Sequence, residues 1–376
     1  MRIFFYPPFK PLDHSRPSGD LVIATGLKNF LADQGHQVHP VSSFRARWIY
    51  WKPWLWPRVF SERRRIIREA DRFKPDLWLT YHTYYKAPDT LGPEVCRRAG
   101  LPYVIFQGMY STKRRRRLKT RPGFYLNRKA LIAARHVFSN RREDLVNLAR
   151  LLPRERITYV PPGIYPDEFV FSDRDRETHR REWGVGDRPV VLSAAMFRPG
   201  VKTDGLTWVI RACGRLVRQG MDLILVIAGD GPGRPGLERL AAEQLAQGVR
   251  FVGQVPRERM SALYSAGDLF AFPGFRESLG MVYLEAQSCG LPVVACANGG
   301  VPEVVRDGGT GLLTPVDDGA AFSRAMARLL TDPAMARRMG QAGRAYVREY
   351  HDLAKNYRAM EWILLRLAGR MTGRGI

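Results

Sequence analysis

The sequence has few cysteines and no long apolar run, and both shortages narrow the choice of protein class. Four cysteines occur in 376 residues, Cys96, Cys213, Cys289 and Cys296, and their spacing fits no metal-ligand motif. They predict buried small residues in a reducing compartment and not a disulfide framework. No apolar stretch is long enough to span a membrane, and the start MRIFFYPPF lacks the layout of a signal peptide. We therefore expect a cytoplasmic protein.

Acidic residues are also scarce, and the deficit is uneven along the chain. The net charge is +24, and the first 170 residues hold 32 Lys/Arg against 14 Asp/Glu. This asymmetry predicts a polyanionic partner, which could be an anionic bilayer, an acidic glycan or nucleic acid. The length, with 45% hydrophobic residues, exceeds what one hydrophobic core usually holds and favours two domains.

The most informative stretch lies in the second half of the chain. An apolar strand at 269–272 is followed by a Pro-Gly turn and a loop that carries Glu277. A helix-period segment then runs from Gly280 to Cys289, and a second buried strand, 291–296, leads into Asn298-Gly299-Gly300. This alternation of strand, loop and helix predicts a parallel α/β sheet.

Two glutamates of this stretch are candidate binding residues. The amides that follow Glu277 open a helix, and a helix N-terminus suits a phosphate or a sugar hydroxyl. Glu285 lies further along the helix, where its two carboxylate oxygens could accept both hydroxyls of a ribose. The alternative is a surface helix with two solvated glutamates. The position of the loop at the carboxyl end of a buried strand favours a ligand site.

These residues carry a resemblance. A cluster of motifs resembles the family 4 retaining nucleotide-sugar glycosyltransferases. It consists of Glu277 and Glu285, separated by seven residues, and of the downstream segments Gly290-Leu291-Pro292-Val293-Val294 and Gly299-Gly300-Val301-Pro302-Glu303. The resemblance implies the α/β GT-B architecture, in which two Rossmann-like doubly wound domains face a central cleft. We place an acceptor-side domain at 1–170 and a nucleotide-sugar domain at 171–355. A C-terminal helix and tail at 356–376 would cross back to the first domain.

The resemblance also implies roles for individual residues of the second domain. Glu277 would face the donor sugar and Glu285 would hold the ribose. Arg198 and Lys202 would clamp the diphosphate, although an ordinary surface loop is the alternative. The remaining donor-binding residues are Ser278, Leu279, Gly280, Met281, Gly229, Asp230, Gly231, Gly253, Gln254 and Val255. A dinucleotide fingerprint at 229–233 is disfavoured because Arg234 stands where its third glycine belongs.

In the first domain the chain departs from the family pattern. The family usually has a glycine pair in the first loop, whereas here Gly19 alone stands near the helix start as the acceptor-loop residue. The family commonly has a histidine after the strand 102–106, and Gln107 takes that place. His82, after the strand 76–80, is a substitute candidate for the reacting centre, although a lone histidine at a strand end is more often structural.

The resemblance implies transfer of a sugar from a nucleotide diphosphate sugar to a hydroxyl, with retention at the anomeric carbon. The acceptor would be a glycan or a lipid-linked molecule of the cell-envelope type. The resemblance is not to the other large transferase fold, which has an Asp-x-Asp metal site, so we expect no metal and no cofactor. Alternatives are a nucleotide-sugar epimerase, a sugar phosphorylase, or a non-catalytic membrane or nucleic-acid binder.

An aromatic and basic segment stands apart from these motifs. Residues 48–60, WIYWKPWLWPRVF, combine four tryptophans with basic residues, and arginines follow at 63–65 and 68. Tryptophan favours the bilayer interface and basic residues favour anionic lipid. Together with the run Lys113–Arg117, the segment predicts peripheral contact with the inner face of the cell membrane. The alternatives are an aromatic flap packed on its own domain and, less favoured, a stacking platform for nucleic acid.

Overall fold

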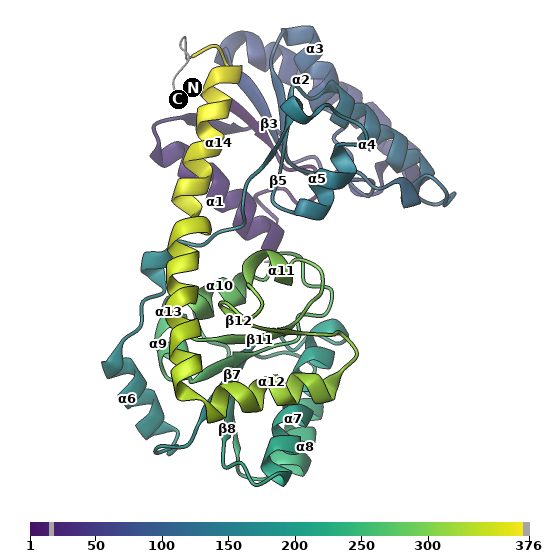
Figure 1. Ribbon diagram of the computed structural model, residues 1–376. Helices are drawn as coiled ribbons and strands as arrows, with labels where there is room; N and C mark the ends of the chain where they lie inside the picture. Colours follow the sequence, from purple (N-terminus) through teal and green to yellow (C-terminus); the bar gives the residue numbers. More distant parts are fainter. Residues whose placement is uncertain (15–18, 371–376) are drawn as a thin grey trace. The chain divides into compact units, whose positions relative to one another are not determined.

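The computed structural model describes residues 1–14 and 19–370, so the end of the predicted C-terminal tail, 371–376, lies outside the described residues. The chain divides into two compact units. Unit 1 consists of Met1–Pro161 and Ala354–Ile376, and unit 2 consists of Pro162–Leu353 (Figure 1). The first division precedes the expected residue 170 because Ile164 and Phe169 are buried in the hydrophobic core of unit 2.

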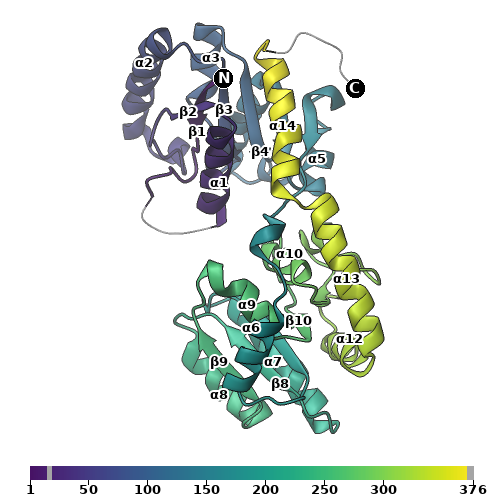
Figure 2. The ribbon, with the colours of Figure 1, turned by 90° about the vertical axis from the view of Figure 1, so that its left-hand side faces the viewer.

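Unit 1 is built on a parallel sheet with the strand order β2-β1-β3-β4-β5-β6. Its strands are β1 (Arg2–Tyr6), β2 (Gln37–Pro40), β3 (Leu77–Thr83), β4 (Tyr103–Gly108), β5 (His136–Ser139) and β6 (Ile157–Tyr159). Its helices are α1 (Gly19–Asp33), α2 (Trp56–Phe73), α3 (Gly92–Ala99), α4 (Arg121–Ala133), α5 (Arg142–Leu148) and α14 (Leu353–Leu367). Helices α1 and α14 lie on one face, and α2, α3 and α4 lie on the other (Figures 1 and 2).

Unit 2 repeats this plan with the order β12-β11-β10-β7-β8-β9, again parallel. Its strands are β7 (Val190–Ala194), β8 (Ile224–Ala228), β9 (Val249–Gly253), β10 (Leu269–Ala271), β11 (Val293–Cys296) and β12 (Gly311–Thr314). Its helices are α6 (Asp173–Glu182), α7 (Val201–Arg218), α8 (Arg234–Leu245), α9 (Met260–Ser265), α10 (Met281–Ser288), α11 (Val301–Val304), α12 (Gly319–Thr331) and α13 (Pro333–Tyr350). The predicted α/β class with two doubly wound sheets is confirmed.

The last helix, α14, belongs to unit 1 although it follows unit 2 in the chain. The ring of Tyr357 packs edge-on against Phe30 at 5.3 Å and against Phe106 at 6.1 Å. His36 Nε2 lies 2.7 Å from a carboxylate oxygen of Glu361. These contacts join α14 to α1, to β4 and to the start of β2, so the end of the chain completes the core of the first unit.

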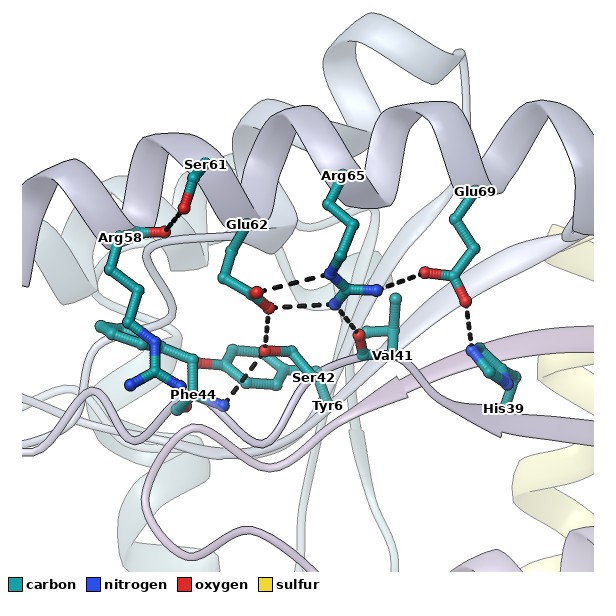
Figure 3. Close-up of polar contacts among 10 residues, drawn as sticks. All are labelled: Tyr6, His39, Val41, Ser42, Phe44, Arg58, Ser61, Glu62, Arg65 and Glu69. Atoms are coloured by element: carbon teal, nitrogen blue, oxygen red, sulfur yellow. Dashed lines mark hydrogen bonds and ion pairs between the residues drawn. The ribbon is translucent and has the colours of Figure 1, made fainter.

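Helix α2 is held by its buried Val59 and Ile66. It is also held by its polar face, which Figure 3 shows. Arg65 lies between Glu62 and Glu69, at 2.9 and 2.6 Å. Beyond them, Ser42 donates a hydrogen bond to Glu62 and His39 lies 2.5 Å from Glu69. The helix is thereby joined to β2 and to the segment that follows it.

These contacts correct part of the sequence interpretation. The sequence analysis counts the arginines at 63–65 among the basic residues that favour anionic lipid, but Arg65 is neutralised in the ion pairs above. Arg63 turns inward and donates two hydrogen bonds to the carbonyl oxygen of Thr90. Successive residues of a helix point about 100° apart, so neighbouring arginines face different surroundings. Arg64 and Arg68 stay exposed and make no comparable ion pair or hydrogen bond in the described part of the chain.

Candidate functional site

The candidate site of unit 2 lies at the topological switch point of its sheet. Strands β7 and β10 are neighbours, and the chain leaves them in opposite directions, so the loops after them diverge at the carboxyl edge. Lys202 follows β7 as the second residue of α7, and Glu277 follows β10. Lys202 Nζ lies 2.5 Å from Glu277 Oε2, so the switch point holds a cation and a carboxylate in direct contact.

The backbone around Glu277 is shaped by close approach of the loop after β11. The amide of Gly300 donates to the carbonyl of Glu277 at 3.0 Å. A Cβ at Gly299 would collide with that carbonyl oxygen, and one at Gly300 would collide with the carbonyl oxygen of Ser278. The pair Gly299-Gly300 is therefore required by the packing of the two loops, which fixes where Glu277 stands.

Helix α10 begins beside this carboxylate. Its N-cap residue, Gly280, has φ +68°, a left-handed conformation in which glycine costs least. Ser278 donates its amide to Glu277 Oε1 at 3.2 Å. Within the residues that the structure describes, the amides of Leu279 and Gly280 donate no hydrogen bond. The N-terminus of α10 thus has donors available for an anion or a sugar hydroxyl.

Glu285 is buried on α10 and has two partners that the sequence motifs did not reveal. Arg257 Nη1 lies 3.2 Å from one of its oxygens, and the hydroxyl of Tyr264 donates to the other at 3.0 Å. Burial raises the pKa of Glu285, and Arg257 and Tyr264 offset part of that rise. The carboxylate is therefore oriented from both oxygens, with its remaining lone pairs available for further donors.

A cavity of about 380 Å³ opens along the carboxyl ends of β7, β8 and β9. The sequence-predicted residues that line it are Arg198, Gly229, Asp230, Gly231, Gln254 and Val255. Gly253 stands at the end of β9, and its carbonyl accepts the amide of Gly229 at 2.7 Å. The cavity thus brings together part of the set that the resemblance assigned to nucleotide and diphosphate, while Lys202 and Glu285 do not line it.

In unit 1 the candidates His82 and Gln107 lie on neighbouring strands. Both residues have a left-handed backbone conformation, with φ +58° for His82 and +61° for Gln107. In the pairing of β3 with β4 they stand between the paired residues Tyr81↔Phe106 and Thr83↔Gly108, and they are not themselves paired. His82 was expected after its strand, but β3 continues through it to Thr83. Non-glycine residues in this conformation are uncommon and gather at functional sites.

His82 has a partner that the sequence analysis missed as a site residue. Its Nδ1 lies 2.9 Å from Asp20 Oδ1, in the first turn of α1. Burial alone would raise the pKa of Asp20, but the hydrogen bond and charge of His82 lower it. Gly19, the predicted acceptor-loop residue, is the first residue of the same helix. An acidic residue at a helix start is an ordinary capping signal, so no sequence pattern pairs Asp20 with His82.

The aromatic segment 48–60 divides into packed and exposed tryptophans. Trp48 is half-buried and packs edge-on against Tyr50, whereas Trp51 and Trp54 are 51% and 69% exposed. Trp51 Nε1 donates a hydrogen bond to the carbonyl oxygen of Lys119 at 3.0 Å. The segment therefore lies beside the basic loop, which contains the run Lys113–Arg117 and continues to Lys119. Leu118, in that loop, is 80% exposed. Trp48 thus packs on its own domain, whereas Trp51 and Trp54 stay exposed.

Neither a membrane-spanning helix nor a metal-binding cluster occurs among the described residues. No helix there is both long and apolar enough to span a bilayer. No group of three or more His, Cys, Asp or Glu side chains within residues 1–14 and 19–370 has an arrangement that could hold a metal ion.

Comparison with known proteins agrees with this geometry. Residues 175–346 match the family model of glycosyl transferases, group 1. The chain is 39% identical over 200 residues to the GDP-mannose-dependent alpha-(1-6)-phosphatidylinositol monomannoside mannosyltransferase of Mycolicibacterium smegmatis, covering 51% of this chain and 52% of that protein. It is 35% identical over 256 residues to the D-inositol 3-phosphate glycosyltransferase of Nocardia farcinica, covering 63% and 55%. The chain thus spans about half the length of the curated relatives it matches.

Among solved structures, HepE from Anabaena in complex with UDP matches with a TM-score of 0.74 at 18% identity, covering 97% of this chain and 100% of that one. At that identity the match establishes the fold alone. The likeness to GT-B glycosyltransferases that the Glu277–Glu285 motif predicted is confirmed by the family model and by the fold.

Proposed function

We propose that this chain, whose second unit carries a group 1 glycosyl transferase domain, moves a sugar from a nucleotide diphosphate sugar to a hydroxyl of a glycan or lipid-linked acceptor. The observation that carries the proposal is the convergence at one sheet edge of Lys202, Glu277, the open N-terminus of α10 and the buried Glu285. Lys202 and the free amides of the helix N-terminus are suited to bind a diphosphate, and the two carboxylates are suited to accept hydrogen bonds from sugar hydroxyls.

The proposed reaction retains the configuration of the anomeric carbon and uses no metal. The bond from that carbon to the diphosphate oxygen breaks, and a bond to the acceptor oxygen forms. The departing phosphate takes the acceptor's proton. Arg198, Lys202 and the N-terminus of α10 offset the charge that builds on the diphosphate. Because Lys202 is held by Glu277 before the donor arrives, we propose that binding moves this cation from carboxylate to phosphate.

The acceptor side of the proposal rests on unit 1. We propose that His82 and Gln107 contact the acceptor, with Asp20 as the positioning residue that orients the imidazole. The exposed Trp51, Trp54 and Leu118, beside Arg115–Arg117, would lie against an anionic bilayer. A membrane contact fits a lipid-linked acceptor, which stays at the bilayer surface. One relative is named for a phosphatidylinositol monomannoside acceptor, which supports a lipid-linked acceptor. Another is named for inositol 3-phosphate, which carries no lipid.

The decisive experiment measures product formation with purified protein. A panel of GDP- and UDP-sugars is tested with glycolipid acceptors, beginning with GDP-mannose and phosphatidylinositol mannosides. We expect a glycosylated product whose anomeric configuration, read by NMR, matches that of the donor. Conversion of the donor without acceptor would indicate an epimerase, and a requirement for inorganic phosphate would indicate a phosphorylase. Either result would contradict the proposal.

A further inference from the structure

Unit 1 contains a cavity of its own, and Arg63 and Thr90 are part of its lining. It measures about 1180 Å³ and is lined at the start of β4 by Pro102 and Tyr103 and at the start of β5 by Arg135 and His136. These are the amino ends of the strands. His82 and Gln107 lie at the carboxyl ends of β3 and β4, on the opposite edge of the sheet. The cavity therefore does not belong to the proposed acceptor site.

Cationic side chains from several elements line this cavity. They are Arg63 of α2, Arg97 of α3, Lys129 of α4, Arg135 before β5, Arg156 before β6 and Arg366 of α14. Among the residues described by the structure, Arg97 is the one member of this set that forms an ion pair, with Glu94. Arg63 and Arg156 donate to backbone carbonyls instead. The other five cations thus face the cavity without an ion pair to any carboxylate of the described residues.

The acidic residues of the cavity do little to balance this charge. Asp89 is buried and accepts hydrogen bonds from Thr80, Tyr103 and the amides of Leu91 and Gly92, and burial raises its pKa. Glu94 is held by Arg97 and Arg98. Glu155 is the remaining carboxylate of the lining. The cavity is therefore positive in sum.

Two further observations indicate that the electrostatic potential in the cavity is positive and that polar atoms there lack hydrogen-bond partners. Burial, together with the charges of Arg366 and Arg156, lowers the pKa of His136 to about 4. The Thr90 hydroxyl and Arg156 Nε are buried and have no hydrogen-bond partner within the described ranges 1–14 and 19–370. Buried polar atoms are usually satisfied, so each of these two is explained by a ligand or by ordered water.

We propose that this cavity is a binding site for a multiply charged phosphate compound, held by Arg135, Arg156 and Arg366. Guanidinium groups match phosphate oxygens in pairs, and several of them around one space favour more than one phosphate group. The volume exceeds what a single phosphate fills. The same chemistry is offered by a soluble polyphosphorylated compound and by the headgroup of an acidic phospholipid. The proposal does not depend on the proposed sugar transfer.

The test uses the whole chain of residues 1–376 with Lys202→Ala, so that Lys202 does not contribute to phosphate binding at the switch point of unit 2. Isothermal titration with inorganic tripolyphosphate represents the soluble source, and short-chain phosphatidic acid below its micellar concentration represents the lipid source. Arg135→Gln with Arg366→Gln should weaken binding at least tenfold. Both side chains are exposed and make no hydrogen bond in the described residues, so the fold should tolerate their loss.

The matched control is Arg68→Gln with Arg72→Gln, which removes the same charge from an exposed part of α2 that does not line the cavity. It should bind either probe within twofold of the parent. Binding of tripolyphosphate alone, or of the lipid alone, would support the site and identify its source. Equal losses in the two double variants, unchanged binding in the cavity variant, or no binding of either probe would overturn the proposal.

Discussion

Lys202 and Glu277 are 75 residues apart in the chain and 2.5 Å apart at the switch point of the second sheet. The ammonium also lies over the ring of Phe272, 5.3 Å from its centroid. The strand order forces this meeting, because β7 and β10 are neighbours and their following loops leave the same edge. A cation held in this way is ready to exchange one anionic partner for another.

Removing Glu277 should separate turnover from nucleotide binding. Glu277→Ala takes away the proposed sugar contact but releases Lys202, so we expect turnover to fall strongly while affinity for the free nucleotide diphosphate stays equal or rises. Calorimetry and a transfer assay measure the two effects. Glu258→Ala, an exposed carboxylate on the same unit, is the control and should change neither. Normal turnover in a folded Glu277→Ala protein would refute the role.

Glu285→Gln should weaken nucleotide binding without weakening the fold. Loss of the charged acceptor should cost about 1–3 kcal/mol of binding free energy, the range for hydrogen bonds to charged groups. The raised pKa means that the ionised carboxylate opposes folding at neutral pH, so the neutral amide should leave the unfolding temperature unchanged or higher. Titration calorimetry and thermal unfolding test both parts. Unchanged nucleotide affinity would exclude the ribose contact.

The Arg257–Glu285 pair predicts that nucleotide affinity depends on pH. Nucleotide binding that needs the Glu285 carboxylate is lost as pH falls through its pKa, which lies above the usual glutamate value. Arg257 lowers that pKa, so Arg257→Gln should move the acid limb of binding to higher pH. Arg259→Gln, an exposed neighbour, should leave the profile in place. An unshifted acid limb in Arg257→Gln would show that Arg257 does not tune this carboxylate.

Substitutions at Gln107 should show that the backbone there is strained. Its φ of +61° costs an L-residue about 1 kcal/mol relative to glycine, so Gln107→Gly should be more stable than Gln107→Ala by about that amount. Urea unfolding of the two variants measures the difference. If the side chain contacts the acceptor, both variants lose turnover to a similar degree although their stabilities differ. Equal stability of the two variants would mean that no strain is stored there.

The exposed apolar residues beside the basic loop should anchor the protein to anionic vesicles. Trp54→Ser with Leu118→Ser should lower the partition constant by about tenfold or more, because each residue contributes apolar burial at the interface. Val146→Ser, which removes a similarly exposed apolar group from α5, is the control. Binding should fall as salt rises, since screening shortens electrostatic reach to about 8 Å at physiological ionic strength. Absence of the wild type from sedimented anionic vesicles at low salt would refute membrane contact.

The sequence by itself determined the parallel α/β class, the position of the Glu277 loop and the glycines that shape it. These features are local, because apolar runs, helix periodicity and turn residues are written within one element or its neighbours. Gly299-Gly300 could be predicted from the motif, and the structure supplies the reason in the carbonyls that approach them.

Only the tertiary structure decided which charges are free and which are paired. Arg65 and Arg64 are adjacent in sequence, yet one is held between two glutamates and the other is exposed. The pairs Asp20–His82 and Arg257–Glu285 join residues from different elements, and strand order sets their distance. No local pattern encodes such contacts, because a side chain's partner depends on which helix face packs inward and on which strands become neighbours.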